Sequence, residues 1–252
     1  MCPEYAIAAY PLARTFGKKS ALWYVHRQVS LKLWFAERLV DKIFTASRES
    51  FRLPSRKVEI VGHGIDFSMP QFRNIPIPVG QKLHIVTVGR VSPIKDIRTL
   101  ILGFFEVRKR FPDAQFSVIG KPITEADKRY EKELHADFSS AVTFVGGIPH
   151  ALIYMKHPYT AFVHASKTGS LDKAPLEALA AGLPVFTSSE AFSEAIPGVT
   201  KFEQGNPDDL AEKITAAFER GAIGYNEQGR EWVIRNHNLA ALAQKVIAFY
   251  TA

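Results

Sequence analysis

Residues 88–96, VGRVSPIKD, place two cations where a strand-like run gives way to a helical one. Arg90 directly follows Gly89, Pro93 stiffens the turn, and Lys95 lies near the start of the next helical pattern. An arginine presents a planar fork of N–H donors and a lysine presents a point charge, and both groups bind phosphate oxygens. The pair therefore indicates a diphosphate site, with an ordinary pair of surface cations as the alternative.

Residues 166–185, SKTGSLDKAPLEALAAGLPV, combine a turn of small residues with the start of a helix. Gly169 and Ser170 allow backbone N–H groups to approach a ligand closely, and a helix that begins near Asp172–Lys173 would direct its partial positive charge to the same space. Glu177 lies about one turn inside this helix, where a carboxylate can accept hydrogen bonds from two hydroxyls of a ribose. A solvent-facing glutamate is the alternative, but the small and apolar flanking residues, APLEALAAG, favour a binding role.

Together the two segments predict a pocket for a nucleoside diphosphate, with the cations and the helix terminus at the phosphates and the glutamate at the sugar. The predicted donor-binding residues are Gly89, Gly169, Ser170, Leu171, Asp172, Lys173 and Glu177. The sequence has no Walker glycine loop, its GHGID segment is too short for a dinucleotide fingerprint, and no Asp-x-Asp motif or His/Asp cluster offers an obvious metal site. We therefore expect protein groups to neutralise the phosphate charge, without a metal or other cofactor.

Strand-like and helix-like stretches alternate from Leu83 onward, and this alternation would position both segments. Strands are expected at LHIVTVG, AQFSVIG, VTFVG, AFVHAS and PVFTSS, with helices between them that include TEADKRYEKELHADF, capped by Thr124, and NPDDLAEKITAAFERG, capped by Asn206. This order indicates an α/β fold with a doubly wound parallel sheet. The carboxyl ends of parallel strands meet at one edge of such a sheet, where its ligands bind, so the two segments are expected at that edge.

The first part of the chain is less regular. Its strands SALWYVH, DKIFTAS and KVEIVGHGID and its helix SLKLWFAERLV are too few for an independent doubly wound sheet. The proline-rich stretch PQFRNIPIPVGQK is typical of a linker, and HALIYMKH is expected to form a short helix. We predict a partial N-terminal Rossmann-like domain at 1–69, a linker at 70–81, a complete Rossmann-like domain at 82–225 and a final helix at 226–252.

Composition narrows the class of protein. The 252 residues are 46% hydrophobic and 23% charged, which is ordinary for a soluble globular protein. Cys2 is the sole cysteine, so an internal disulfide is excluded and a reducing compartment is expected. No apolar run approaches the roughly 18 residues that a membrane-spanning helix needs, and the first residues lack the layout of a signal peptide. The predicted location is cytoplasmic.

Positive charge is concentrated near the start of the chain. Residues 1–60 contain eleven Lys and Arg against five Asp and Glu, and the whole chain has a formal charge of +7. A basic surface attracts nucleic acid, anionic lipid or nucleotide, and a solvated positive face is the alternative. Nucleic acid is not expected because no binding module is recognisable. The helix SLKLWFAERLV is amphipathic, and one interpretation is that it makes peripheral contact with the inner face of the cell membrane. The other interpretation is that it packs in the core of the protein.

Four motifs, VGRVSPIKD, FVGGIPH, AFVHAS and LEALAAGLPV, resemble the C-terminal domain of GT-B fold retaining glycosyltransferases of family 4, the glycosyl transferases group 1. The resemblance covers about residues 40–252 in the expected order, and FTASRESFRLPSRKVEIVGHGID resembles the end of the N-terminal domain of that family. Each motif alone is weak, but their combination is specific.

This resemblance implies a metal-independent hexosyltransferase that moves a sugar from a UDP- or GDP-sugar donor to a glycan or lipid-linked acceptor, with retention of configuration. Arg90 and Lys95 would bind the donor diphosphate and act in catalysis, and Glu177 would bind the ribose. His26 lies where the family often has a histidine that faces the reaction centre. The final helix would cross back to the N-terminal domain.

Two departures from the family pattern stand out. Gly169 occupies the position, eight residues before the glutamate, where the family usually has an acidic residue in contact with the donor sugar, and Asp172 is the nearby residue that could replace it. Most of the acceptor-side N-terminal domain of the family has no counterpart in this sequence. The alternative function is therefore a nucleotide-sugar-binding fragment that needs a partner chain, or a homodimer, for activity.

Overall fold

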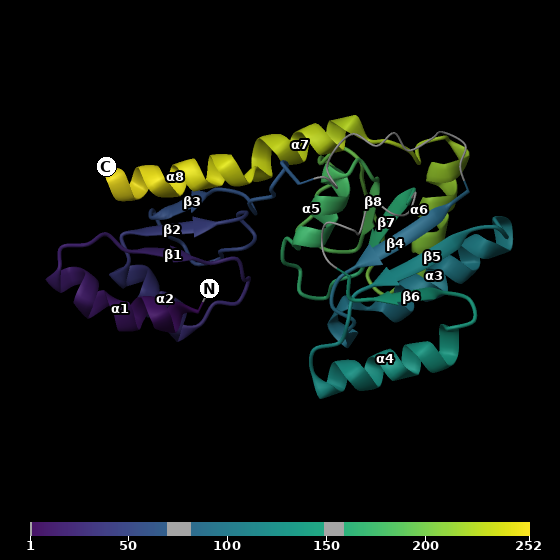
Figure 1. Cartoon of the computed structure of the whole chain (residues 1–252), viewed down its shortest axis with the longest axis horizontal. Helices are drawn as coiled ribbons and strands as arrows, with labels where there is room; N and C mark the ends of the chain where they lie inside the picture. The colour runs from purple at the N-terminus through teal and green to yellow at the C-terminus, as the bar shows by residue number, and fades with distance from the viewer. Residues whose placement is uncertain (1, 70–81, 149–158) are drawn as a thin grey trace. The chain divides into compact units, whose positions relative to one another are not determined.

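The computed structural model describes residues 2–69, 82–148 and 159–252. The chain divides into two compact units (Figure 1). The first unit contains Met1–Asp66 together with Ile234–Ala252, and the second contains Phe67–Val233. The predicted linker at 70–81 and the predicted helix HALIYMKH lie outside the described residues.

The second unit is built on a six-stranded parallel sheet with the strand order β6-β5-β4-β7-β8-β9. The strands are β4 (His84–Val88), β5 (Gln115–Ile119), β6 (Thr143–Gly146), β7 (Ala161–His164), β8 (Val185–Thr187) and β9 (Val199–Lys201). The order runs outward in both directions from β4 and β7, so the topological switch point lies between these two strands. The predicted α/β fold with a parallel sheet is confirmed, and β9 is an additional strand that the pattern analysis did not find.

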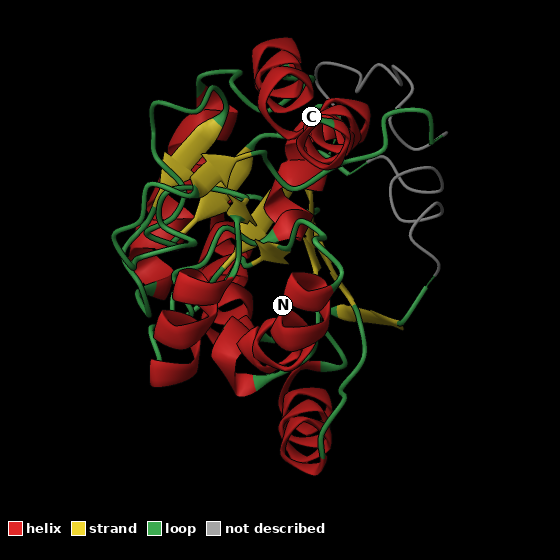
Figure 2. Cartoon of the chain, turned by 90° about the vertical axis from the view of Figure 1, so that its left-hand side faces the viewer, coloured by secondary structure: helices red, strands yellow, loops and turns green. Residues whose placement is uncertain are grey.

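Helices cover both faces of this sheet, and Figure 2 distinguishes the helices of the chain, in red, from its strands, in yellow. They are α3 (Ile97–Arg110), α4 (Glu125–Phe138), α5 (Lys173–Ala180), α6 (Pro207–Glu219) and the start of α7 (Glu227–His237), with a single 3₁₀ turn, η2 (Pro93–Lys95), before α3. In β7, Ala161 and Val163 belong to the core cluster that includes side chains of α3, α4 and α6, and Phe162 between them is also fully buried. Successive residues of a strand face opposite sides of the sheet, so the burial of all three residues means that both faces of the sheet are covered by other elements. Side chains on both faces are therefore apolar, which explains the continuous apolar runs in the sequence.

The first unit has a three-stranded parallel sheet in the order β1-β2-β3. Its elements are β1 (Ala21–Trp23), β2 (Lys42–Thr45), β3 (Val58–Ile60), α1 (Pro3–Thr15), α2 (Leu31–Leu39) and α8 (Leu239–Thr251). Leu22, Leu33, Ile43 and Phe51 form the centre of a small core in which α2 packs on the strands. Ile65 and Asn238 form a parallel β-bridge, so the end of the chain belongs to the same unit as its beginning.

The helix caps read from the sequence are present. The Thr124 hydroxyl accepts a hydrogen bond from the Asp127 N–H at 3.2 Å, and the Asp127 carboxylate accepts one from the Thr124 N–H at 3.0 Å, which completes a capping box on α4. The Asn206 side chain accepts a hydrogen bond from the Asp209 N–H at 3.0 Å at the start of α6. These local hydrogen bonds depend only on neighbouring residues, which is why the sequence predicts them well.

The prediction of one final helix at 226–252 is wrong, because the segment forms α7 and α8 with a break between them. The Asn238 side chain accepts hydrogen bonds from the N–H groups of Ala240 and Ala241 and so caps a second helix. The pattern analysis also did not find α1, whose interior contains Pro11, a residue that normally breaks a helix.

His237 makes the stability of the first unit sensitive to acid. Its side chain is buried, and its Nδ1 accepts a hydrogen bond from the His63 N–H at 3.1 Å. Burial and the proximity of His63 lower the pKa of His237 to about 4, from 6.5. The unfolded chain therefore binds a proton as the pH falls below about 6.5, while the folded chain does not until about pH 4.

We expect this histidine to reduce the free energy of unfolding by up to about 3 kcal/mol between pH 6.5 and pH 4. The measurement is urea unfolding across this range for the wild type and for His237→Asn, which does not titrate. The variant should lose less stability on acidification than the wild type. Parallel pH profiles for the two proteins would contradict the expectation.

Candidate functional site

The predicted phosphate-binding cations lie at the carboxyl edge of the second unit's sheet. Gly89 and Arg90 follow β4, and Lys95 ends the 3₁₀ turn η2 before α3. These three residues line a crevice of about 10 Å³ together with His164, at the end of β7, and the ends of β4 and β5. The crevice thus lies beside the switch point between β4 and β7, where ligands of doubly wound sheets bind.

Asp172 connects Lys95 to the sheet. Its Oδ2 accepts hydrogen bonds from Lys95 Nζ at 2.5 Å and from His164 Nε2 at 2.8 Å. Lys95 Nζ also donates to the Ser166 hydroxyl at 3.3 Å, and His164 Nδ1 lies 3.0 Å from the Thr187 hydroxyl. The network joins η2, β7, β8 and the N-cap of α5, so it fixes Lys95 relative to the start of that helix.

The protonation states within this network follow from burial and charge. Burial by itself would raise the pKa of Asp172, but the hydrogen bond from His164 and the charge of Lys95 outweigh burial and lower this pKa well below its ordinary value. Burial is the main cause that lowers the pKa of His164, so its ring is neutral near pH 7. Because a carboxylate only accepts, His164 donates its Nε2–H to Asp172 and accepts from Thr187 at Nδ1.

The turn before α5 has the conformation that its small residues suggested. Gly169 has φ of 61°, in the left-handed region that favours glycine. The hydroxyls of Ser166, Thr168 and Ser170 form a chain, with oxygen separations of 2.9 and 2.8 Å. Leu171 is buried. The turn therefore presents a row of hydroxyls directly before the N-terminus of α5.

Glu177 is buried within α5, with 3% of its surface exposed. Its carboxylate lies 3.6 Å from Lys173 Nζ, one turn earlier on the same helix. The solvent-facing interpretation of this glutamate is therefore wrong. Glu177 lies in α5, whose N-cap is Asp172, but it does not line the crevice that contains Arg90 and Lys95.

Arg90 is the more accessible of the two cations. Its side chain is 40% exposed, and its Nε lies 3.9 Å from the Asp127 carboxylate. Its position depends on a close approach of two turns, because the Gly120 backbone lies directly against the carbonyl of Gly89. Arg90 is thus held at the edge of the sheet with its side chain partly accessible.

His26 lies in the first unit, whereas all other predicted site residues lie in the second. It is exposed in the loop after β1, and its ring packs edge-on against Tyr24 with centroids 5.5 Å apart. The Tyr24 hydroxyl donates to the Gln28 carbonyl at 2.6 Å and so ties this loop together. A catalytic role for His26 stays a prediction.

Sequence reasoning missed His164, Ser166 and Thr187 as members of the site. A signal was present, because each is a polar residue at or just after the end of an otherwise apolar strand. Two further buried hydroxyls at this edge, those of Ser92 and Ser188, make no hydrogen bond to the described residues.

Within the described ranges, no three His, Cys, Asp or Glu side chains are grouped so as to hold a metal ion. None of the helices in the same ranges is both long enough and apolar enough to span a membrane.

Solved structures show the fold class of the chain. HepE from Anabaena, in complex with UDP, matches with a TM-score of 0.82 and 14% identity over 99% of this chain and 76% of HepE. A mutant of TarM from S. aureus, in complex with UDP and other ligands, matches with a TM-score of 0.71 and 14% identity over 93% of this chain and 51% of TarM. The lipopolysaccharide outer core galactosyltransferase WaaB matches with a TM-score of 0.68 and 16% identity over 99% of this chain and 73% of WaaB. The fold is of the GT-B type.

The sequence comparison identifies the family. Residues 82–220, more than half of the chain, match the family described as Glycosyl transferases group 1. The chain belongs to this family, as its motifs predicted. A comparison with curated protein sequences found no match.

Proposed function

We propose that this protein transfers a sugar from a nucleotide-diphosphate sugar to an acceptor with retention of configuration. The observation that supports this proposal most strongly is that Arg90 and Lys95 line one crevice at the carboxyl edge of the sheet, with Lys95 joined to the N-terminus of α5 through Asp172. The structural neighbour HepE has been solved with UDP-glucose, which favours a UDP-hexose as the donor. The unpartnered hydroxyls of Ser92 and Ser188 fit a site completed by a polar ligand, since buried hydroxyls normally have partners.

The diphosphate would lie at the mouth of the crevice, because a volume of about 10 Å³ is too small to hold it. Arg90 would reach its oxygens from the exposed side, and Lys95 would share its charge between Asp172 and the phosphate. The hydroxyls of the turn before α5 and the backbone N–H groups at its N-terminus would donate to the remaining oxygens. In this arrangement the protein itself neutralises the donor phosphates.

The reaction breaks the bond between C1 of the donor sugar and the phosphate oxygen and forms a bond from C1 to the acceptor oxygen on the same face of the sugar. Negative charge grows on the departing diphosphate as this bond stretches, and Arg90 and Lys95 bind that charge more strongly than they bind the intact donor. The leaving phosphate takes the proton of the acceptor hydroxyl, so no side chain is needed as a general base. The family usually has an acidic residue at the position of Gly169, which has no side chain in this protein. Asp172, which is held by His164, is the nearby carboxylate that would contact the donor sugar instead.

Glu177 would accept hydrogen bonds from the ribose hydroxyls. Since hydrogen bonds to a charged group contribute about 1.5–3 kcal/mol each, we expect Glu177→Gln to weaken UDP binding by about tenfold to hundredfold. Calorimetric titration with UDP and with GDP measures this effect and identifies the base. Glu212→Gln is the matched control, because Glu212 is an exposed residue of α6. Equal UDP affinities in the wild type and Glu177→Gln would refute the assignment of the ribose site.

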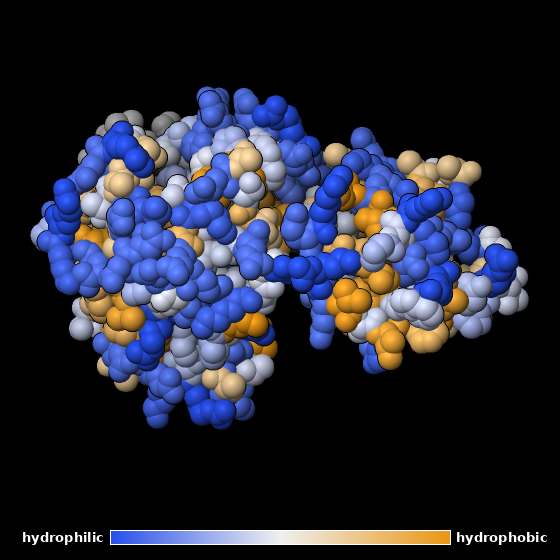
Figure 3. Space-filling model, turned by 180° about the vertical axis from the view of Figure 1, so that it is seen from behind, coloured by the Kyte–Doolittle hydropathy of each residue, from blue (hydrophilic) through white to orange (hydrophobic). Residues whose placement is uncertain are grey.

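We further propose a lipid-linked or envelope glycan as the acceptor. The first unit exposes large apolar side chains on α1 and α2, namely Tyr5, Leu12, Leu31 and Phe35. Figure 3 shows apolar side chains on this unit beside strongly hydrophilic ones, a combination suited to the surface of an anionic membrane. A transfer assay with labelled UDP-sugar, the whole chain and a membrane extract tests the proposal. Label in the lipid-extractable fraction is expected, and label confined to free sugar would contradict it.

A further inference from the structure

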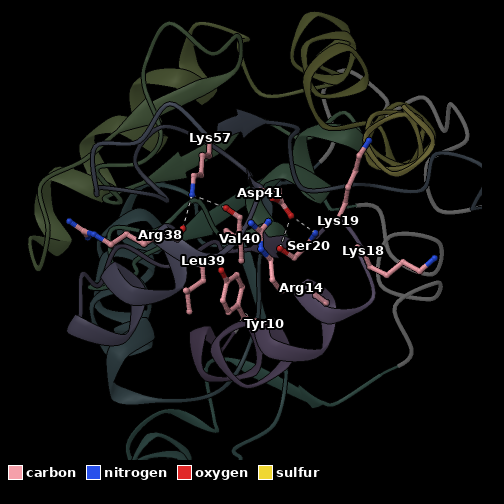
Figure 4. A pocket seen from close by; sticks show the side chains of 12 residues that line it. Tyr10, Arg14, Lys18, Lys19, Ser20, Arg38, Leu39, Val40, Asp41 and Lys57 are labelled. Atoms are coloured by element: carbon pink, nitrogen blue, oxygen red, sulfur yellow. Dashed lines mark hydrogen bonds between the residues drawn. The ribbon is translucent and has the colours of Figure 1, made fainter.

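The first unit contains an open pocket of about 500 Å³ at the edge of its sheet where the strands begin (Figure 4). Ser20 directly precedes β1, Asp41 precedes β2 and Lys57 precedes β3, and all three line the pocket. The C-terminal turns of α1 and α2 complete its walls. Donors of this fold class bind at the opposite, carboxyl edge of a sheet, so the proposed glycosyl transfer does not account for this pocket.

The pocket is strongly basic. Its lining contains five cationic side chains and one carboxylate: Arg14, Lys18, Lys19, Arg38 and Lys57, with Asp41. A concave site lined mainly by charges of one sign concentrates the electrostatic field and attracts counter-ions of the opposite sign. The residues that line the pocket therefore carry an excess of four positive charges.

Two of the charged groups are occupied by the fold. Lys57 Nζ donates to the carbonyl oxygens of Glu37 at 2.7 Å and Val40 at 2.8 Å, so it satisfies the end of α2. The Asp41 carboxylate accepts hydrogen bonds from the Ser20 N–H at 2.7 Å and the Ser20 hydroxyl at 2.9 Å. The hydrogen bond from the Ser20 N–H is the main cause that holds the pKa of Asp41 below its usual value. These contacts explain the presence of Lys57 and Asp41 without a ligand.

The other cations are not explained in this way. The charge of Arg14 is one of the smaller causes that lower the pKa of Asp41, but the charged ends of Arg14 and Lys18 form no hydrogen bond or ion pair with any described residue. Arg38 only stacks on the Trp34 ring. Lys19 donates to the Phe249 carbonyl at 3.1 Å, which leaves its positive charge without a carboxylate. Figure 4 shows Arg38 and Lys18 on opposite sides of the pocket with Arg14 between them. Cations held around one hollow repel one another, and the single carboxylate of Asp41 offsets only one of the five positive charges.

We propose that this pocket binds a molecule that carries two or more phosphate charges. Its volume suits a ligand of the size of a phosphorylated sugar or a lipid headgroup. Two arginines can each form paired N–H bonds to phosphate oxygens, and the flexible lysines can adjust to a second phosphate. The ligand class is thus defined by its phosphate groups, which a phospholipid headgroup and a soluble phosphorylated compound share.

The first experiment is a calorimetric titration of the whole chain with inorganic pyrophosphate. The double variant Arg14→Gln and Lys18→Gln should bind about tenfold more weakly than the wild type, because two contacts from exposed charges are lost and each exposed ion pair contributes little. Both residues are exposed, so the substitutions leave the core intact. The matched control is Arg48→Gln with Arg52→Gln, which removes the same charge from exposed residues of the same unit outside the pocket. Equal affinities of the wild type and the pocket variant would overturn the proposal.

The second experiment locates the site, since pyrophosphate also suits the proposed donor site. Amine-reactive labelling read by mass spectrometry should show Lys18 and Lys19 protected by pyrophosphate, with the exposed Lys132 of α4 unchanged. Absence of protection at saturating pyrophosphate would also overturn the proposal. Sedimentation with phosphatidylcholine vesicles, with and without phosphatidylglycerol, then separates the two sources. If the wild type binds the anionic vesicles and the pocket variant does not, the ligand is a lipid headgroup. If the wild type binds pyrophosphate but not the vesicles, the ligand is a soluble phosphorylated compound.

Discussion

Replacement of Lys95 by alanine is expected to lower kcat of sugar transfer by about a hundredfold to a thousandfold, the usual cost of removing one donor that stabilises transition-state charge. The Lys95 ammonium lies at the crevice beside Arg90 and is fixed there by Asp172 and Ser166. Such a preorganised charge acts mainly on the departing diphosphate, so KM for the donor should change much less than kcat. Steady-state kinetics with a UDP-sugar donor measure both parameters.

The pairing with Asp172 requires two controls. Lys95→Ala leaves the Asp172 carboxylate without its cation, which could disturb the fold and not only the chemistry. The double variant Lys95→Ala and Asp172→Asn removes that unpaired charge, and the reaction should stay slower in it than in Asp172→Asn alone, which measures the loss of the proposed sugar contact. Lys132→Ala removes an exposed cation of α4 and should have no effect. Recovery of kcat in the double variant would show that Lys95 acts only through the fold.

Replacement of Gly120 by alanine is expected to destabilise the second unit by about 3 kcal/mol and to displace Arg90. Gly120 has φ of 150°, and a Cβ atom at this position would collide with the carbonyl oxygen of Gly89. The backbone fixes the position of the Cβ atom, and its partner is a backbone oxygen, so no side-chain rotation can relieve the collision. The turn that carries Gly89 and Arg90 would have to move, and donor binding should weaken along with stability.

Urea unfolding and UDP titration of Gly120→Ala measure these two effects. Gly224→Ala is the matched control, because a Cβ atom there has no heavy atom within 4 Å. The control should change the free energy of unfolding by less than about 1 kcal/mol. If Gly120→Ala were as stable as this control and bound UDP normally, the close approach of the two turns would not matter for the site.

Much of the fold was predictable because its signals are local. The apolar runs of β4, β5 and β7 bury both faces of a strand, and such runs have few other interpretations. Thr124 and Asn206 cap α4 and α6 through hydrogen bonds that span three residues. Where local signals conflicted, the analysis fell short: α1, which contains Pro11, was not predicted, and Asn238 splits the single helix that was predicted at 226–252.

The sequence by itself determined the type of sheet, the edge at which polar residues gather and the family of the protein. Only the tertiary structure decided which of those residues interact. His164 and Asp172 are eight residues apart and Lys95 is far from both in sequence, yet they form one network, while Glu177 is buried away from the crevice. Lys57 and Asp41 likewise meet their partners through the packing of α2 and β1, and the pocket between them has no sequence motif. Hydrogen bonds within a helix or strand follow from neighbouring residues, whereas contacts between elements depend on how the whole sheet brings its strand ends together.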